Sequence, residues 1–129
     1  METGNYLELF YNYAKKNQIE IIEVFSVLEK DTENKELVDS LFINLHVLNG
    51  NASGLGFKAV ESMAHVLEDV FSEIREGKLE FNNIVLKETK IAIDTLGKLI
   101  EALKSGEKVT YLVSKTRLGA ILGQVKQNN

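Results

Sequence analysis

Apolar residues recur at helical spacing along almost the whole chain, and this periodicity limits the folds that the chain can adopt. In residues 4–30, large apolar side chains follow one another at intervals of three or four, so they fall on one face of a helix. Proline, which would interrupt such helices, is absent from all 129 residues. No stretch alternates apolar and polar residues as a half-buried strand does. The sequence therefore predicts an all-α protein.

Turn-forming residues divide the apolar pattern into five segments. Aspartate, asparagine, serine and glycine lie between the segments and supply turn and capping chemistry. The predicted helices cover residues 4–30, 35–52, 57–76, 83–104 and 109–125. Short connections favour antiparallel neighbours, so we expect an antiparallel up-and-down four-helix bundle with an additional fifth C-terminal helix packed on it. A chain of 129 residues can bury a core without disulfides or a metal, which favours a single domain over residues 1–129.

Composition excludes several classes of function. Without cysteine the chain has no disulfide, thiol nucleophile or thiolate metal site. A net charge of −4 with no basic stripe argues against a general binder of nucleic acid or of anionic membranes. The N-terminus lacks the basic and apolar regions of a signal peptide, and no run approaches the roughly 18 apolar residues of a membrane span. We therefore expect a cytoplasmic protein that binds neither nucleic acid nor a membrane.

The stretch LFINLHVLNGNASGLGF, residues 41–57, carries the candidate reactive residue. Its apolar stripe has spacings of four, three and four: Leu41, Leu45, Leu48 and Ala52. His46 lies about 100° around the helix from this stripe, where the root of the side chain can pack and its tip can meet water. Gly50 stands one turn further on the same face, although glycine inside a helix costs roughly 1 kcal/mol relative to alanine. A position without a side chain lets another protein approach the imidazole, so His46 is a candidate for reaction with a partner.

These residues resemble the signature of a known family. His46-Val47-Leu48-Asn49-Gly50, followed by Ala52 and Gly56-Phe57, is similar to H-x-[LI]-K-G-x-[AS]-x-x-x-G-[FL], which is typical of histidine phosphotransfer (HPt) domains. The next helix carries His65-Val66-Leu67-Glu68, nineteen residues after His46, as the family's second histidine and its glutamate require. The chain is most similar to the N-terminal phosphoacceptor domain of CheA-type chemotaxis histidine kinases, which has a fifth helix that most free-standing HPt domains lack.

The resemblance implies a phosphoacceptor of a two-component phosphorelay. Neutral imidazole is a good nucleophile near pH 7, and Nε2 of His46 would accept the phosphoryl group while Glu68 holds the Nδ1–H. His65 would support Glu68 or the helix interface without reacting. The phosphoryl group would come from a histidine kinase catalytic domain and pass to an aspartate of a response-regulator receiver domain. Phe42 and Val47 flank the histidine and would contact the receiver.

No part of the chain supplies a nucleotide site of its own. The glycines around residue 54 lack the lysine and hydroxyl residue of a phosphate-binding loop and follow no strand. ATP and Mg²⁺ are therefore expected on the partner kinase domain, and this domain, a monomer when isolated, is expected to bind no cofactor and to have no activity on ATP alone. His46, His65 and Glu68 are also potential Zn²⁺ ligands. Dedicated metal sites have more compact ligand spacing, so we expect no metal.

One position departs from the family signature. The family usually has lysine three residues after the histidine, where this chain has Asn49. Lysine would attract the incoming phosphoryl group, whereas asparagine offers hydrogen bonds without charge. Lys58, near the end of the third predicted helix that faces the site, is a candidate to supply the missing charge. The alternative function is a catalytically silent helical docking module that kept the HPt fold and binds receiver domains without phosphotransfer.

Overall fold

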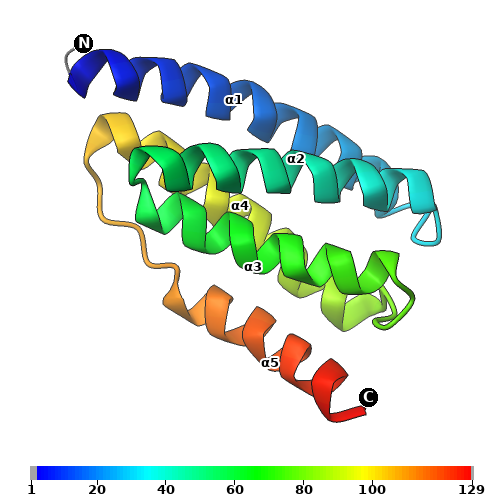
Figure 1. Ribbon diagram of the computed structural model, residues 1–129. Coiled ribbons are helices and arrows are strands. Elements are labelled where there is room, and N and C mark those ends of the chain that lie inside the picture. Colours follow the sequence, from blue (N-terminus) through cyan, green and yellow to red (C-terminus); the bar gives the residue numbers. More distant parts are fainter. Residues whose placement is uncertain (1–2, 129) are drawn as a thin grey trace.

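Five α-helices make up the computed structural model of the chain, which describes residues 3–128 (Figure 1). In chain order they are α1 (Thr3–Leu28), α2 (Lys35–Leu55), α3 (Lys58–Arg75), α4 (Asn83–Ser105) and α5 (Leu112–Asn128). The described residues contain no strand, so the expected all-α class is confirmed. Helix α1 contacts α2 and α4, and α3 contacts the same two helices from the other side. Helix α5 packs against α3 and α4 after an extended connection (Figure 1).

Side-chain contacts show that neighbouring helices run antiparallel. As residue numbers rise along α2 they fall along α3, in three pairs: Asp39 with Arg75, His46 with Glu68, and Asn49 with His65. Between α1 and α4, the ion pair Glu8–Lys104 lies at one end of the contact, and the pair Glu29–Lys90, in which Glu29 directly follows α1, lies at the other. The architecture is therefore an antiparallel four-helix bundle with an additional fifth helix, as the sequence predicts.

Asparagine and glycine define several helix ends. The side chain of Asn34 accepts hydrogen bonds from two backbone N–H groups in the first turn of α2, and that of Asn82 accepts one in the first turn of α4. At the other ends of these helices, Gly56 and Gly106 adopt left-handed φ values of 80° and 75°. Such residues close a helix because glycine alone enters this conformation without a steric penalty.

Several helix ends differ from the predicted bounds. Helix α2 continues to Leu55 instead of ending at residue 52, because Ser53 and Gly54 stay helical and the chain leaves the helix only at Gly56. Helix α5 begins at Leu112 instead of residue 109, since the residues before it belong to the extended connection. The remaining differences are of one to three residues, against the predicted ranges 4–30, 57–76, 83–104 and 109–125.

One hydrophobic core lies between the helices and fixes the orientation of α2. The predicted stripe of α2 is fully buried: Leu41, Leu45, Leu48 and Ala52. At one end of α2, Phe57 stacks on Phe10 of α1 with ring centroids 4.7 Å apart. Near its middle, Asn17 of α1 donates a hydrogen bond of 2.9 Å to the side-chain oxygen of Asn44. With this face of α2 packed, His46 lies at its exposed edge, on the side of α3.

No helix within residues 3–128 combines the length and the apolar character that crossing a bilayer requires.

Candidate functional site

His46 lies on the outer face of α2 and is held by one carboxylate. Its side chain is 67% exposed, whereas that of Glu68 on α3 is only 12% exposed. Nδ1 of His46 lies 2.8 Å from Oε2 of Glu68. A carboxylate only accepts, so this contact places the proton on Nδ1 and leaves the lone pair of the neutral ring on Nε2. The spacing of the two residues on antiparallel helices therefore produces an oriented, exposed imidazole nitrogen.

Asn49 binds the second oxygen of the same carboxylate. Its Nδ2 donates to Oε1 of Glu68 at 3.1 Å and lies 3.2 Å from Nδ1 of His65. Each oxygen of Glu68 thus has a donor from α2, one turn apart along that helix. The sequence analysis expects Asn49 to offer hydrogen bonds without charge, and the structure identifies their partners as Glu68 and His65.

His65 turns its other nitrogen toward Asp69, one turn further along α3. The His65 Nε2 to Asp69 Oδ2 distance is 3.4 Å. Burial raises the pKa of the Asp69 carboxyl, and the neighbouring imidazole of His65 opposes this rise. Both residues line a surface hollow of about 420 Å³ between α3 and α5, together with Lys58 and Lys115. Lys58 is the first residue of α3 and is exposed. It lines the same hollow as His65, on the α5 side of the site.

Phe42 supports the imidazole from the preceding turn of α2. Its ring lies nearly parallel to that of His46, at an interplanar angle of 16° and a centroid distance of 6.1 Å. The guanidinium of Arg75 covers Phe42 at 4.4 Å from the ring centroid and pairs with Asp39 at 3.6 Å. Sequence reasoning missed Arg75. The available signal was its position seven residues after Glu68, which puts both on one face of α3.

The surface beside His46 on α2 combines exposed apolar side chains with two glycines, which have no side chain. Val47 is 38% exposed and Ile43 is 57% exposed, one turn before it. Further along the helix, a Cβ added to Gly50 or Gly54 would meet no atom within 4 Å. Neither glycine is thus required by packing inside the domain, which agrees with the idea that a second molecule approaches α2 here.

Alanine is expected to have opposite effects at Gly50 and Gly56. Inside α2, Gly50→Ala improves helix propensity in open space, so it should raise the free energy of unfolding by about 0.5–1 kcal/mol. Gly56→Ala places a Cβ on a residue with φ of 80°, and this strain should lower the free energy of unfolding by about 1–2 kcal/mol. Urea unfolding of both variants beside the wild type measures the two shifts. A destabilised Gly50→Ala variant would mean that Gly50 serves the fold and not access to His46.

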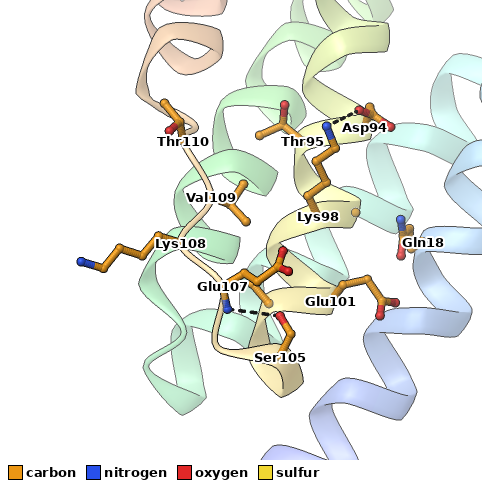
Figure 2. A pocket seen from close by; sticks show the side chains of 12 residues that line it. Gln18, Asp94, Thr95, Lys98, Glu101, Ser105, Glu107, Lys108, Val109 and Thr110 are labelled. Carbon is orange, nitrogen blue, oxygen red and sulfur yellow. Dashed lines mark hydrogen bonds and ion pairs between the residues drawn. The ribbon is translucent and has the colours of Figure 1, made fainter.

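A further cavity of the molecule contains none of the predicted site residues. This cavity has a volume of about 690 Å³ and lies between α1, α4 and the connection after α4, with Gln18 close to Gly97. Charged side chains of both signs, among them Lys98 and Glu107, surround it (Figure 2). Within residues 3–128, no group of three or more His, Asp or Glu side chains is arranged to hold a metal ion. The chemistry available at His46 therefore lies on an open helix surface that a partner can reach.

Comparisons with known proteins identify the family of the domain. Residues 14–106 match the model of the Hpt domain family. The chain is 28% identical over 123 residues to the chemotaxis protein CheA of Halobacterium salinarum, a match that covers 94% of this chain and 18% of that protein. It is 30% identical over 110 residues to the chemotaxis protein CheA of Borreliella burgdorferi, covering 84% of this chain and 12% of that protein. The chain thus spans less than a fifth of the length of these relatives.

The fold also matches a solved structure. The crystal structure of the phosphorylated P1 domain of CheA3 in complex with CheY6 from R. sphaeroides superposes with a TM-score of 0.76. The match has 22% sequence identity and covers 95% of this chain and 97% of that one. At this identity the likeness establishes the five-helix fold.

Proposed function

Because this chain belongs to the Hpt domain family and is similar to the phosphoacceptor region of CheA proteins, we propose that it carries a phosphoryl group in a chemotaxis-like two-component system. His46 accepts the group from ATP held by a histidine kinase catalytic domain and passes it to an aspartate of a response-regulator receiver domain. One observation carries this proposal: Glu68 holds Nδ1 of His46 at 2.8 Å while the side chain remains 67% exposed.

The proposed reaction needs little from this domain besides an oriented nucleophile. The Nε2 lone pair of His46 attacks the γ-phosphorus, the N–P bond forms, and the bond to the bridging oxygen breaks as ADP leaves. The ring, protonated on Nδ1 and substituted on Nε2, then carries a positive charge, which the carboxylate of Glu68 stabilises. In the second step an aspartate oxygen attacks phosphorus, the N–P bond breaks, and its electron pair returns to Nε2. ATP and Mg²⁺ belong to the kinase domain throughout.

Positive charge close to the site is part of the same proposal. The family's usual lysine is replaced by Asn49, so we assign the attraction of the phosphoryl group to nearby cations. Arg75 above Phe42 is the cation that the contacts place beside His46. Lys58, the candidate from the sequence, begins α3 ten residues before Glu68, about 15 Å along the helix, and contributes at longer range. His65 supports Glu68 through Asn49 and does not react.

Phosphorylation in trans tests the proposed function. The domain is mixed with Mg-ATP and the dimerisation and catalytic domains of a CheA-type kinase from the same source. Incorporated phosphate that is labile in acid and stable in alkali is expected, because this is the behaviour of an N–P bond. No incorporation, with the kinase shown to phosphorylate another acceptor, would instead favour the silent docking module, which binds receiver domains without phosphotransfer.

The receiver is proposed to dock on α2 around Phe42 and Val47. Val47→Asp should slow phosphotransfer to the receiver about tenfold through a higher KM, because it puts a charge on an apolar contact. Ile84→Asp is a matched control, since Ile84 is 68% exposed at the start of α4. Transfer kinetics from the phosphorylated domain measure both variants. Equal rates for the two variants would place the docking surface elsewhere.

A further inference from the structure

Arg75, the last residue of α3, holds its guanidinium on the surface with one edge free. Its Nε lies 3.6 Å from Oδ1 of Asp39, and the flat face of the group covers Phe42, with the central carbon 4.4 Å from the ring centroid. Within residues 3–128 this is the only ion pair of Arg75, and it leaves both terminal nitrogens without a carboxylate. These nitrogens form the edge with which a guanidinium binds two oxygens of a phosphoryl group.

Phe42 places the guanidinium between two positions of α2. Asp39 comes three residues before Phe42 and His46 four residues after it, so all three side chains lie on one face of the helix. The Phe42 ring lies beside the imidazole, at a centroid distance of 6.1 Å. From its place over Phe42, the guanidinium reaches a group bound to His46 by moving about one helical turn, or 5.4 Å, away from Asp39. The Arg75 side chain is 46% exposed, so this movement does not disturb the core.

We propose that a phosphoryl group on His46 takes Arg75 away from Asp39. The exchange rests on the proposed function and deepens it, because it gives the site two arrangements that depend on phosphorylation. The pair with Asp39 is easily broken, since both side chains are about half exposed and meet through one nitrogen at 3.6 Å. A phosphoryl group carries a charge of about −1.5 to −2 and three acceptor oxygens. It engages both terminal nitrogens of Arg75, and such a bidentate contact is stronger than the pair it replaces.

The exchange leaves Asp39 without its cation on the outer surface of α2. Asp39 lines a hollow of about 430 Å³ between α1 and α2, together with Glu20, Glu36 and the exposed side chain of Ile43. After the exchange, the three carboxylates of this hollow are no longer compensated by the arginine. Ile43 stands one turn before Val47, where the receiver is proposed to dock. The phosphorylated domain therefore presents a more negative surface to the receiver than the unphosphorylated domain does.

The equilibrium between the phosphorylated and the unphosphorylated domain measures the exchange. Kinase domains and a fixed ratio of ATP to ADP set this equilibrium, and the fraction of phosphorylated domain gives its constant. Arg75→Gln should lower the equilibrium constant about fivefold, because a charged bidentate contact to the phosphoryl group is lost. Asp39→Asn should raise it about threefold, because the competitor for Arg75 is removed.

The double variant separates an exchange from simple repulsion between Asp39 and the phosphoryl group. In Asp39→Asn/Arg75→Gln, the equilibrium constant should match that of Arg75→Gln within about 1.5-fold, since Asp39 acts through Arg75. A rise that persists without Arg75 would show direct repulsion and overturn the exchange. Arg117→Gln is the matched control, because Arg117 is 59% exposed and pairs with Glu88 at 3.5 Å, and it should leave the constant unchanged. Equal constants for Arg75→Gln and Arg117→Gln would also overturn the exchange.

Chemical phosphorylation tests the exchange without the kinase. Phosphoramidate transfers its phosphoryl group to histidine as the new N–P bond forms and ammonia leaves. Before phosphorylation, the Nε–H signal of Arg75 in ¹H–¹⁵N spectra should differ between the wild type and Asp39→Asn. After phosphorylation the two signals should coincide, because Asp39 no longer holds the guanidinium. The signal of Arg117 should stay in place throughout, and His46→Gln should show no change on treatment.

The two experiments distinguish a failure of the exchange from a failure of the proposed function. If the kinase domains do not phosphorylate the domain but the Arg75 signals converge with phosphoramidate, the proposed function fails and the exchange stands. If mass spectrometry shows the phosphoryl group on His46 and the Arg75 signals of the wild type and Asp39→Asn remain as far apart as before, the exchange is overturned.

Discussion

His46→Gln is expected to abolish phosphate uptake while leaving the fold intact. The variant has no nucleophilic ring nitrogen, and no other described residue combines an exposed imidazole with a carboxylate at 2.8 Å. The fold should survive because the side chain is 67% exposed and lies outside the core, and a glutamine amide can still donate to Glu68. We expect the free energy of unfolding to change by less than about 0.5 kcal/mol.

The measurement compares incorporated phosphate with stability in the same preparations. His65→Gln is the control, because it removes the other histidine and should retain uptake on His46, at a reduced rate. Urea unfolding of both variants shows whether a loss of uptake comes from a loss of structure. Acid-labile phosphate on His46→Gln would assign the acceptor to His65 and refute the central assignment.

Glu68→Gln is expected to lower kcat for phosphorylation on the order of 100-fold, equivalent to about 2.7 kcal/mol, without moving the phosphate from His46. The carboxylate stabilises the charge that develops on the imidazole, and the neutral amide does not. A glutamine side chain also has one acceptor oxygen, whereas Glu68 uses two, because His46 and Asn49 donate to different oxygens of its carboxylate. One of these two hydrogen bonds must therefore be lost.

Rapid-quench kinetics with saturating kinase domains measure this loss. The matched control is Glu61→Gln, which removes a carboxylate from the same helix two turns earlier, in the hollow beside Lys58. It should change kcat by less than about twofold, because exposed charge changes away from a reacting group have small effects. If Glu68→Gln reacted as fast as Glu61→Gln, the contact between Glu68 and His46 would have no part in the reaction.

Most of the fold could be predicted from the sequence because apolar spacing records which face of each helix is buried. The end of α2 was predicted less accurately, because Ser53 and Gly54 favour turns but stay helical. They follow Ala52, which is buried in the core near the end of α2. The prediction was also wrong where apolar residues pack without a helix. Val109 and Tyr111 contact the core from the extended connection, and from sequence alone they extend the pattern of α5.

The candidate site was predictable to the extent that spacing determines position. His46 and Glu68 meet as the family resemblance implies, since their helices are antiparallel neighbours. The contacts of Asn49 were not foreseen, because a residue type does not tell which atom faces which acceptor. Arg75 was missed for a related reason: its contact with Phe42 depends on how a long side chain folds back over a ring.

The three side-chain pairs between α2 and α3 also make the rate of phosphate uptake depend on how these two helices are aligned. Asp39–Arg75, His46–Glu68 and Asn49–His65 all form at one alignment of the two helices. A slip of one turn, about 5.4 Å, would bring Ala64 or Ser72 opposite the histidine and separate all three pairs at once. Two-helix contacts with a shifted alignment would still bury apolar surface and still look helical by circular dichroism. They would lack the Glu68 contact and are expected to take up phosphate on the order of 100-fold more slowly, so the rate of uptake distinguishes the native bundle from its near-native alternatives.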